Sequence, residues 1–350
     1  MRPLLWEGRR LSVLDQRLLP TRVKWVGLRT AEDAFSAIAE MKVRGAPLIG
    51  VVGAFGLALE AGRMGSTPLP RFREGLERVA SRLVSARPTA VNLKWAVDRC
   101  MDSAARAGTV PEAKEALMEE AEWIMAYEER TARRLGEIGE RLIRDGDTVM
   151  THCNAGSLAT VDYGTALSPI RVAIEKGKKV KVVATETRPA LQGARLTALE
   201  LQKDGIDTTL ISDTMVGYAM SQGMVDLVML GADRVLRDGH VINKIGTYQV
   251  ATMASRHSVP FYSVFPWSTV DMKTEKEGVR IEQRSPKEVE FVRGRRVAPK
   301  GIKVFNPAFD ITPPELVTGL VTERGIILPP FYSKLEEADG APYEAVGGGN

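Results

Sequence analysis

The hydrophobic pattern of the chain changes character near Gly146. Before this residue, apolar side chains recur at helical spacing, as at Ala34, Ile38 and Met41, and predict a mainly helical N-terminal domain over residues 1–145. The apolar runs 4–6 and 11–14 flank a polar turn, and they predict a small β-hairpin at its start. The helices expected after the hairpin are one that Thr30 caps and Pro47 interrupts, one at 51–61, one at 70–86 and one that Asn92 caps. Residues 111–144 are expected to form one or two further helices with solvated, charged faces.

After Gly146, short apolar strands alternate with helical segments such as 191–203 and 214–222. This alternation is typical of a parallel sheet with right-handed crossovers. The fold class is therefore α/β, with the helical domain followed by a Rossmann-like parallel-sheet domain over residues 146–335. The predicted strands are Thr148–Thr151, Val180–Ala184, Thr208–Ser212, Leu227–Leu230 and Phe261–Phe265.

The C-terminal part of the chain has a weaker pattern. Residues 273–304 are charged and predict irregular structure. The Pro-Pro pair before Glu315 favours a last helix over 315–323, because proline is tolerated in a first helical turn. Residues 336–350 end in Gly-Gly-Gly-Asn, and we expect them to form a flexible tail.

Composition indicates the compartment of the protein. The 350 residues are 44% hydrophobic and 26% charged, as is typical of a soluble globular protein. No apolar run reaches the ~18 residues that span a bilayer, and the N-terminus carries no signal-peptide pattern. The two cysteines, Cys100 and Cys153, cannot build a disulfide framework. We therefore expect a cytoplasmic protein with no membrane partner.

Charge decides less about the ligand. The net charge of +4 and the pI near 9.0 suit an anionic small molecule as well as nucleic acid. The sequence contains no basic motif with interleaved aromatic residues and no Cys/His cluster with zinc-like spacing. We therefore expect neither a nucleic-acid partner nor a metal.

Polar residues follow each predicted strand. Cys153, Glu186, Asp213, Asp233 and Asp271 stand at or just beyond the carboxyl end of a strand. In an open α/β sheet these ends meet at one edge, where ligands bind. Isolated polar residues there would be ordinary caps, but five in one register predict a functional site.

Cys153 has two interpretations. A lone cysteine is commonly a buried, inert thiol, and we expect Cys100, on an apolar helix face, to be a core residue. Cys153 instead stands on a strand-end loop of small polar residues. If Ser157 or Thr160 capped a following helix, the helix dipole would favour the thiolate. A reactive thiol and a buried thiol both remain open.

Asp233 also has two interpretations. It follows the apolar strand Leu227–Leu230, and apolar walls would raise the pKa of its carboxyl so that it could donate a proton. Alternatively, it is a helix cap or the ion-pair partner of Arg234. The residues alone do not separate these hypotheses.

Several further residues could bind a phosphate group. Asn243-Lys244 follows the Asp233 strand, and Gly45 would let backbone approach a ligand closely. Arg44, Arg87 and Arg195 are either surface charges or guanidinium forks for phosphate. Neither a G-x-G-x-x-G fingerprint after the first strand nor a P-loop is present, so NAD or ATP binding in the usual way is not expected.

These residues lie within motifs that extend over most of the chain. From about Leu14 to Pro329 the sequence resembles the methylthioribose-1-phosphate isomerases of methionine salvage, which share a superfamily with the initiation factor 2B alpha, beta and delta subunits. The combination is specific, although no single motif is. The motifs are Leu-Asp-Gln at 14–16, Val-Arg-Gly-Ala-Pro at 43–47, Arg-Pro-Thr-Ala-Val-Asn-Leu at 87–93, Thr-His-Cys-Asn-Ala-Gly-Ser-Leu-Ala-Thr at 151–160, Glu-Thr-Arg-Pro at 186–189, Gln-Gly-Ala-Arg-Leu-Thr at 192–197, Gly-Ala-Asp-Arg at 231–234, Asn-Lys-Ile-Gly-Thr-Tyr at 243–248 and Asn-Pro-Ala-Phe-Asp-Ile-Thr-Pro at 306–313.

The resemblance implies a homodimer with no cofactor, a helical N-terminal domain and a Rossmann-like C-terminal domain. It implies that Cys153 and Asp233 are the catalytic pair. The chain departs from the family at 237–240, which read Arg-Asp-Gly-His where the family is usually rich in Asn, Gly and Asp. The implied substrate contacts are Arg44, Gly45, Ala46, Arg87, Gln192, Asn243 and Lys244.

The implied reaction converts 5-methylthio-α-D-ribose 1-phosphate to 5-methylthio-D-ribulose 1-phosphate. The phosphate on O1 locks the sugar as a ring, so the ring must open before hydrogen moves from C2 to C1. Asp233 would protonate the ring oxygen. Cys153 would be either the base at C2 or an electrostatic partner in a hydride shift, and a dry site would help both routes.

Two other interpretations remain. The first is a sister isomerase that acts on ribose 1,5-bisphosphate or 5-deoxyribose 1-phosphate. The Ala-Gly-Ser at 155–157 and the segment 281–286 resemble the methylthioribose enzymes more closely, and no second basic cluster for another phosphate is evident. The second is a non-catalytic regulatory subunit, against which the presence of both Cys153 and Asp233 argues.

Overall fold

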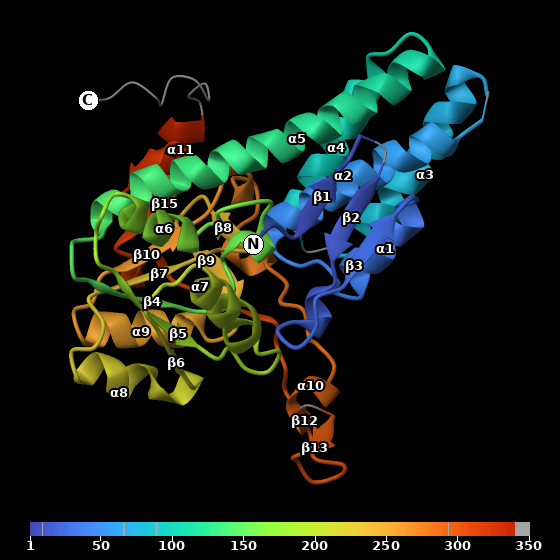
Figure 1. Ribbon diagram of the computed structural model, residues 1–350. Helices are drawn as coiled ribbons and strands as arrows, with labels where there is room; N and C mark the ends of the chain where they lie inside the picture. The colour runs from blue at the N-terminus through green and yellow to red at the C-terminus, as the bar shows by residue number, and fades with distance from the viewer. Residues whose placement is uncertain (9, 66, 88–89, 293, 340–350) are drawn as a thin grey trace. The chain divides into compact units, whose positions relative to one another are not determined.

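The computed structural model describes residues 1–8, 10–65, 67–87, 90–292 and 294–339 of the chain (Figure 1). The chain divides into two compact units. Unit 1 comprises Met1–Arg134 and Gly156–Gly164, and unit 2 comprises Leu135–Ala155 and the chain from Thr165 onward. The chain therefore passes from unit 1 to unit 2 within a helix, returns to unit 1 after Ala155, and leaves it again after Gly164.

Unit 1 begins with an antiparallel sheet in the order β1-β2-β3, and helices follow it. The predicted hairpin is confirmed, because Leu4 pairs with Val13 and Trp6 with Leu11. The third strand was not predicted, since its short Trp-Val-Gly-Leu run does not alternate. The elements are β1 (Leu4–Trp6), β2 (Leu11–Leu14), β3 (Trp25–Leu28), α1 (Ala31–Ala39), α2 (Ala46–Arg63), α3 (Leu69–Val84), α4 (Val91–Ala105) and α5 (Val110–Gly139), the last of which ends in unit 2.

Local sequence explains how these helices begin. Thr30 caps α1 as predicted, in a capping box in which its side chain accepts the Asp33 N–H and the Asp33 side chain accepts the Thr30 N–H. Pro47 does not interrupt a helix, because it stands in the first turn of α2, where a missing N–H costs no hydrogen bond. The predicted Asn92 cap is wrong: α4 is capped at Ala90, and Asn92 is buried in its first turn.

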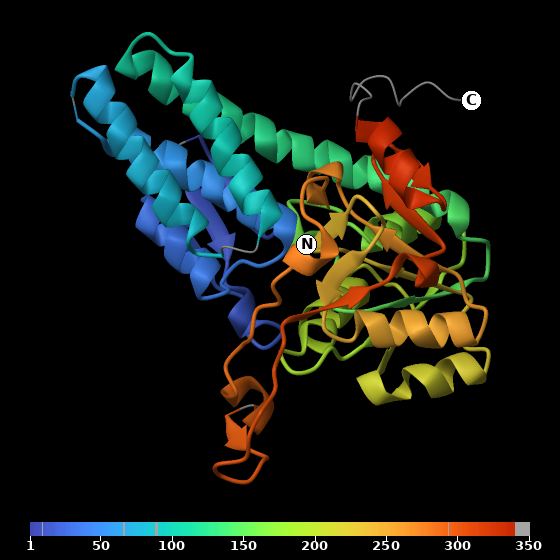
Figure 2. The same ribbon diagram turned by 180° about the vertical axis from the view of Figure 1, so that it is seen from behind.

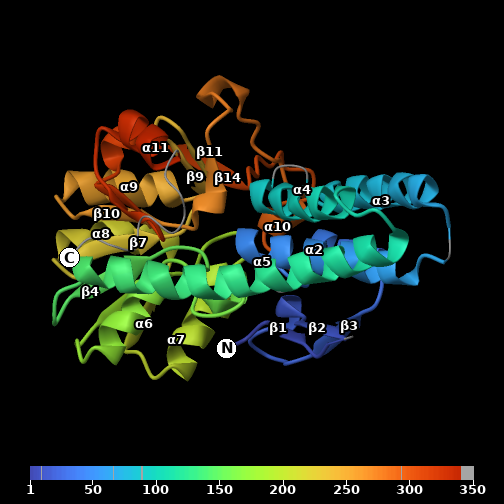
Figure 3. The same ribbon diagram turned by 90° about the horizontal axis from the view of Figure 1, so that it is seen from above.

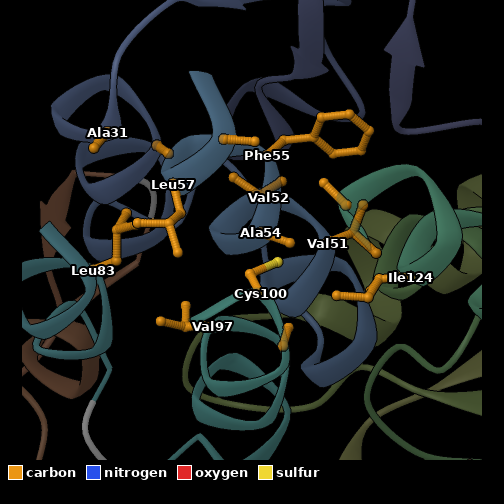
Figure 4. Close-up of a cluster of buried hydrophobic side chains, with 14 of the residues drawn as sticks. Ala31, Val51, Val52, Ala54, Phe55, Leu57, Leu83, Val97, Cys100 and Ile124 are labelled. Atoms are coloured by element: carbon orange, nitrogen blue, oxygen red, sulfur yellow. The ribbon is translucent and has the colours of Figure 1, made fainter. Parts of the chain in front are cut away.

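Helix α2 supplies much of the unit 1 core. Its Val51, Val52 and Phe55 pack with apolar side chains of the neighbouring helices (Figure 4). The Cys100 sulfur lies among these side chains, so its predicted core position is confirmed. Among the described helices, α2 alone is long and apolar enough by length and composition to cross a membrane, although Glu60 ends its uninterrupted apolar run after 14 residues. Since 78% of that window is buried within the fold, core packing accounts for its composition.

Unit 2 is built on a seven-stranded sheet in the order β16-β15-β10-β7-β4-β5-β6. Every neighbouring pair is parallel except β15 and β16. The predicted parallel sheet is thus confirmed, and all the predicted strands occur with ends shifted by at most one residue. The strands are β4 (Thr148–Thr151), β5 (Lys181–Thr185), β6 (Thr208–Ile211), β7 (Leu227–Leu230), β10 (Phe261–Val264), β15 (Gly319–Thr322) and β16 (Gly325–Ile327).

Alternate side chains of the central strands face two separate cores. Val149 and Leu227 pack with α6 (Leu167–Glu175) and α7 (Ala198–Lys203). Met150 and Val228 pack with α8 (Val216–Ser221), α9 (Thr247–Arg256) and α11 (Phe331–Asp339). Figure 3 shows α6 and α7 on one side of the strands and α8 and α9 on the other, and Figure 2 shows the α8–α9 pair from behind. Because both faces are covered, the strands are continuous apolar runs, which made them predictable.

A second sheet of unit 2 has the order β11-β8-β9-β14. Its strands are β8 (Arg234–Leu236), β9 (Val241–Lys244), β11 (Val270–Asp271) and β14 (Phe309–Thr312). The segment 273–304 is mostly irregular, as predicted, with a short helix α10 (Lys287–Glu290) and a hairpin of β12 (Phe291–Val292) and β13 (Arg295–Arg296). This hairpin extends away from the rest of unit 2 in Figures 1 and 2.

The predicted last helix at 315–323 is wrong. A single turn at Pro314–Leu316 is followed by strand β15, which pairs with β10. Its β-branched Val321 and Thr322 suit a sheet, and pairing with β10 outweighs the helix-start signal of the prolines. Residues 336–339 of the predicted tail belong to helix α11, and residues 340–350 lie outside the described residues.

Candidate active site

The carboxyl ends of the unit 2 strands are joined by a chain of hydrogen bonds. The Cys153 N–H, just after β4, donates to Thr187 Oγ1 after β5 (2.9 Å). His152 Nε2 lies 2.9 Å from the carbonyl oxygen of Ile245, which follows Asn243-Lys244. The Asp233 N–H donates to the carbonyl oxygen of Ile242 (3.0 Å). These bonds bring the segments that carry Cys153, Asp233 and Asn243-Lys244 together at the predicted edge.

Cys153 adopts an unusual backbone conformation. It is 8% exposed, and its φ of +66° lies in the left-handed region that disfavours residues with a Cβ. Thr187, its hydrogen-bond partner, has a φ of +62°, which is rarer still for a β-branched side chain. Strained residues of this kind concentrate at functional sites. The geometry therefore favours the functional interpretation of Cys153.

The described residues directly after Cys153 do not form the expected helix. Ser157–Ala159 forms a single 3-10 turn, and α6 begins only at Leu167 with no side-chain cap. Residues 156–164 instead belong to unit 1, where Ser157 Oγ donates to the Met1 carbonyl oxygen (2.7 Å) and Thr160 Oγ1 to that of Asp162 (2.7 Å). Neither Ser157 nor Thr160 caps a helix, so the predicted helix N-terminus beside Cys153 is wrong.

Asp233 differs from the other strand-end aspartates. Asp213 accepts the N–H groups of Thr187 (2.8 Å) and Arg188 (2.6 Å), and Asp271 accepts those of Lys273 and Thr274. The half-buried Asp233 carboxylate makes no hydrogen bond or ion pair with the residues that the structure describes, a property it shares with Glu186. Strand β8 follows Asp233, so it caps no helix. Arg234 pairs with Asp271 instead (3.4 Å).

Asn243 and Lys244 end strand β9 and hold the turn into α9. Asn243 Nδ2 donates to Thr247 Oγ1 (3.0 Å), and Thr247 Oγ1 donates to the Lys244 carbonyl oxygen (2.7 Å). Lys244 Nζ donates to the carbonyl oxygen of Ala308 (3.0 Å) and lies 4.2 Å from the centre of the Phe309 ring. The ammonium group is therefore positioned rather than freely mobile.

Gln192 carries an unsatisfied polar atom. It is 4% exposed, and its Oε1 has no hydrogen-bond partner among the described residues. Gln192 precedes a π-helical turn at Gly193–Thr197, a feature frequent at functional sites. Gly193 is required here, because a Cβ would lie 1.8 Å from the Thr185 carbonyl oxygen. Arg195, on the same turn, donates to the carbonyl oxygen of Ala190 (3.4 Å).

The sequence-based reasoning missed His152. Its ring is 2% exposed, and burial lowers its pKa below the usual range. Because the Ile245 carbonyl can only accept, Nε2 carries the proton, and Nδ1 accepts from Thr185 Oγ1 (2.7 Å). His152 is thus a neutral link between the segments that follow β4 and β9. Its place directly before Cys153 was the one signal that could have identified it.

Asp310 of β14 was not predicted as a site residue, although it lies within the motif at 306–313. It accepts the N–H groups of Gly246 (2.7 Å) and Tyr248 (3.1 Å) at the start of α9. Burial raises its pKa to about 6, against the lowering effect of these bonds and of Lys244. Its role depends on the pairing of β14 with β9, which the sequence did not predict.

The remaining predicted contacts lie in unit 1. Arg44 is buried, and Arg87 follows helix α3. Gly45 has a φ of +97° and precedes Ala46 at the start of α2. A Cβ on Gly45 would lie 2.3 Å from the carbonyl oxygen of Ala159. The absence of a Cβ therefore lets the Ala159 backbone approach Gly45 closely. Their roles as substrate contacts stay predictions.

Comparison with known proteins gives the family. Residues 42–329 match the profile of the Initiation factor 2 subunit family, and the chain belongs to this family. Within it, the chain groups with the methylthioribose-1-phosphate isomerases. It is 49% identical to that of Thermosipho africanus, over 95% of this chain and 96% of the relative. It is 50% identical to that of Desulforudis audaxviator, over 97% of both chains.

Solved structures agree with the fold. The crystal structure of 5-methylthioribose 1-phosphate isomerase from Pyrococcus horikoshii has a TM-score of 0.89 and 40% identity, over 97% of this chain and 95% of that one. A structure described as the translation initiation factor eIF-2B, subunit delta, from A. fulgidus has a TM-score of 0.85 and 45% identity, over 97% and 99%. The expected α/β fold and family are confirmed.

Proposed function

We propose that the protein converts 5-methylthio-α-D-ribose 1-phosphate to 5-methylthio-D-ribulose 1-phosphate. The observation that carries the proposal is the Asp233 carboxylate, which bonds to none of the described residues and lies at the same edge as the strained Cys153, in a chain whose relatives bear the name of this isomerase. A regulatory subunit would not need a half-buried carboxylate at a sheet edge that bonds to none of the described residues.

The proposed mechanism uses Asp233 as the acid and Cys153 at the migrating hydrogen. Asp233 donates a proton to the ring oxygen, the C1–O bond to that oxygen breaks, and an open-chain oxocarbenium ion results, in which the phosphate-bearing oxygen shares the positive charge of C1. Hydrogen then moves from C2 to C1, and Cys153 is either the base that carries it or the group that stabilises charge during a hydride shift. The C2 hydroxyl gives its proton to the Asp233 carboxylate, so C2 becomes the ketone carbon and the acid is restored. Exclusion of water on substrate binding would strengthen both interactions.

Substrate binding is proposed for residues with suitable chemistry. Lys244 offers a positioned ammonium group for the phosphate, and Asn243, the residue before it on β9, offers an amide. Gln192 Oε1 is a buried acceptor without a partner in the described chain, so it suits a sugar hydroxyl rather than a phosphate oxygen. Arg44, Gly45, Ala46 and Arg87 complete the set of proposed contacts.

A turnover assay on several sugar phosphates tests the proposal. Purified protein is given 5-methylthioribose 1-phosphate, ribose 1,5-bisphosphate and 5-deoxyribose 1-phosphate, with and without EDTA. We expect the highest kcat/KM on the first and no effect of the chelator. Higher kcat/KM on either of the others would move the proposal to that isomerase, and turnover of none would favour the regulatory interpretation that the name of the A. fulgidus structure suggests.

We also propose a cytoplasmic homodimer that acts in methionine salvage and amino-acid biosynthesis. The support is the family and the small number of cysteines, both buried and free. Light scattering on the purified protein tests the dimer, and a monomeric mass at assay concentration would exclude it.

A further inference from the structure

The backbone of Cys153 needs an explanation beyond its own sequence. A residue with a Cβ in the left-handed region is less stable by roughly 1–2 kcal/mol than in the right-handed one. Such a conformation persists only where neighbouring groups fix it. The φ of +66° at Cys153 therefore requires specific restraints.

Two threonine hydroxyls supply these restraints. The Cys153 N–H donates to Thr187 Oγ1 (2.9 Å), and Thr197 Oγ1 donates to the Cys153 carbonyl oxygen (2.6 Å). Both threonines are 0% exposed, so water does not compete for these bonds. The backbone groups on both sides of the Cys153 side chain are thus held by side chains from outside its loop.

Each hydroxyl is itself oriented. Asn154 Nδ2 donates to Thr197 Oγ1 (3.3 Å), so the one Thr197 hydroxyl proton is left for the Cys153 carbonyl. Asn154 Nδ2 also donates to Glu200 Oε1 (2.8 Å), and the fully buried Glu200 pairs with Arg171 (3.1 Å). The π-helical turn that ends at Thr197 therefore rests on a buried ionic network.

Thr187 is fixed from the opposite side. The Thr187 N–H donates to Asp213 Oδ1 (2.8 Å), and this bond holds the left-handed backbone of Thr187. Its Oγ1 lies 3.4 Å from both the carbonyl oxygen and the Oγ1 of Thr185, whose hydroxyl bonds to His152 Nδ1. The Thr187 hydroxyl proton is directed to Thr185, so its lone pair faces the Cys153 N–H.

We infer that Thr187 and Thr197 are positioning residues, whose hydroxyls select the left-handed conformation of Cys153 and thereby place its thiol for the reaction. This inference rests on the catalytic role proposed for Cys153. It explains why β-branched residues occupy two unusual backbone positions. Thr187 lies in the left-handed region, and Thr197 lies in a π-helical turn.

The test removes each hydroxyl while keeping the side-chain shape. Thr187→Val and Thr197→Val are compared in the full chain with Thr187→Ser and Thr197→Ser, which keep the hydroxyl. Thr322→Val is the matched control, because it is equally buried and loses a hydroxyl bond to the Gly325 carbonyl (3.3 Å) at β15. The readouts are kcat, KM, and the rate of Cys153 alkylation by iodoacetamide, followed by peptide mass spectrometry.

We expect each valine variant to lose about tenfold in kcat, with KM within twofold and a changed alkylation rate. The serine variants and Thr322→Val should stay near the parent values. Folded valine variants with parental kcat and alkylation rate would overturn the inference. If the valine variants do not fold, alanine variants replace them, and equal kcat in the alanine and serine variants would also overturn it.

A parallel measurement separates this inference from the proposed function. Cys153→Ala is assayed beside the threonine variants. If it keeps parental turnover, the catalytic role of Cys153 fails, whereas an altered alkylation rate in the valine variants still supports positioning. If it is inactive but the valine variants match the parent in both readouts, only the positioning role fails.

Discussion

The two cysteines of the chain occupy contrasting environments. Cys100 is 0% exposed within the apolar core of unit 1, where burial raises the pKa of its thiol to about 12 (Figure 4). Cys153 stands among polar groups at the end of β4, with its backbone held by two hydroxyls. Of the two thiols, the reactive one is therefore expected to be Cys153.

The first prediction separates the two thiols by substitution. Cys153→Ala should lose nearly all turnover and fold normally, because it removes a site group without opening a large cavity. Cys100→Ala should keep turnover and lose ~1 kcal/mol or more of stability, because it leaves a small cavity in a packed core. Steady-state kinetics and urea unfolding measure the two effects, and the opposite pattern would reverse the assignment.

The second prediction concerns Asp233. Asp233→Asn keeps the side-chain shape but cannot supply an acidic proton, so kcat should fall ~10²-fold or more. KM should change little, because the proposed phosphate contacts remain. Glu186→Gln is the informative comparison, since Glu186 also ends a strand and has no side-chain partner among the described residues. A larger loss of kcat at Glu186 than at Asp233 would transfer the acid role to Glu186.

At the scale of elements, Asp310 links strand β14 to helix α9. It accepts two N–H groups at the start of α9, and burial raises its pKa from 3.8 to about 6. Between these values the unfolded chain has released the proton and the folded chain retains it. Stability from this group is therefore full below the lower value and is lost as pH rises to the upper one.

The third prediction follows from this sign. In the parent, ionisation of Asp310 lowers the unfolding free energy between about pH 4 and pH 6. The Asp310→Asn side chain stays neutral, so the variant should not show this decrease. The unfolding free energy of the variant, relative to the parent, should rise by on the order of 2–3 kcal/mol over that window. Urea unfolding at several pH values measures it. Parallel curves for the two proteins would show that Asp310 does not retain its proton.

Elements with a strong local signal were predictable from sequence. Strands β4 and β7 are short apolar runs covered on both faces, and α1 begins with a capping box. Strands β9 and β15 were not predictable, because each depends on a tertiary contact. Strand β9 pairs with β14, and β15 pairs with β10. The site divides in the same way: strand ends mark Cys153 and Asp233, whereas the roles of His152 and Thr197 depend on hydrogen bonds between distant segments.

At the scale of the whole molecule, unit 1 is completed by a segment from far along the chain. Residues 156–164 belong to unit 1 although they directly follow the Cys153 loop. Val161 is 1% exposed in the unit 1 core, and Gln16 Nε2 donates to the carbonyl oxygen of Leu158 (2.7 Å). Tyr163 accepts a hydrogen bond from Arg133 (2.6 Å). A fragment of residues 1–134 would therefore expose core surface and lose these bonds.

The fourth prediction compares that fragment with one in which residues 156–164 are rejoined through a flexible Gly/Ser linker of about 12 residues. Burial of the valine side chain alone contributes roughly 1.5–3 kcal/mol. For a domain of this size the rejoined fragment should melt on the order of 5–10 °C higher. A rejoined fragment that carries Val161→Ser is the control, and it should lose most of the gain. Equal melting temperatures with and without the segment would mean that residues 1–134 form a complete folding unit. If neither fragment folds, Val161→Ser in the full chain should still lower the unfolding free energy, because the same core position is disrupted.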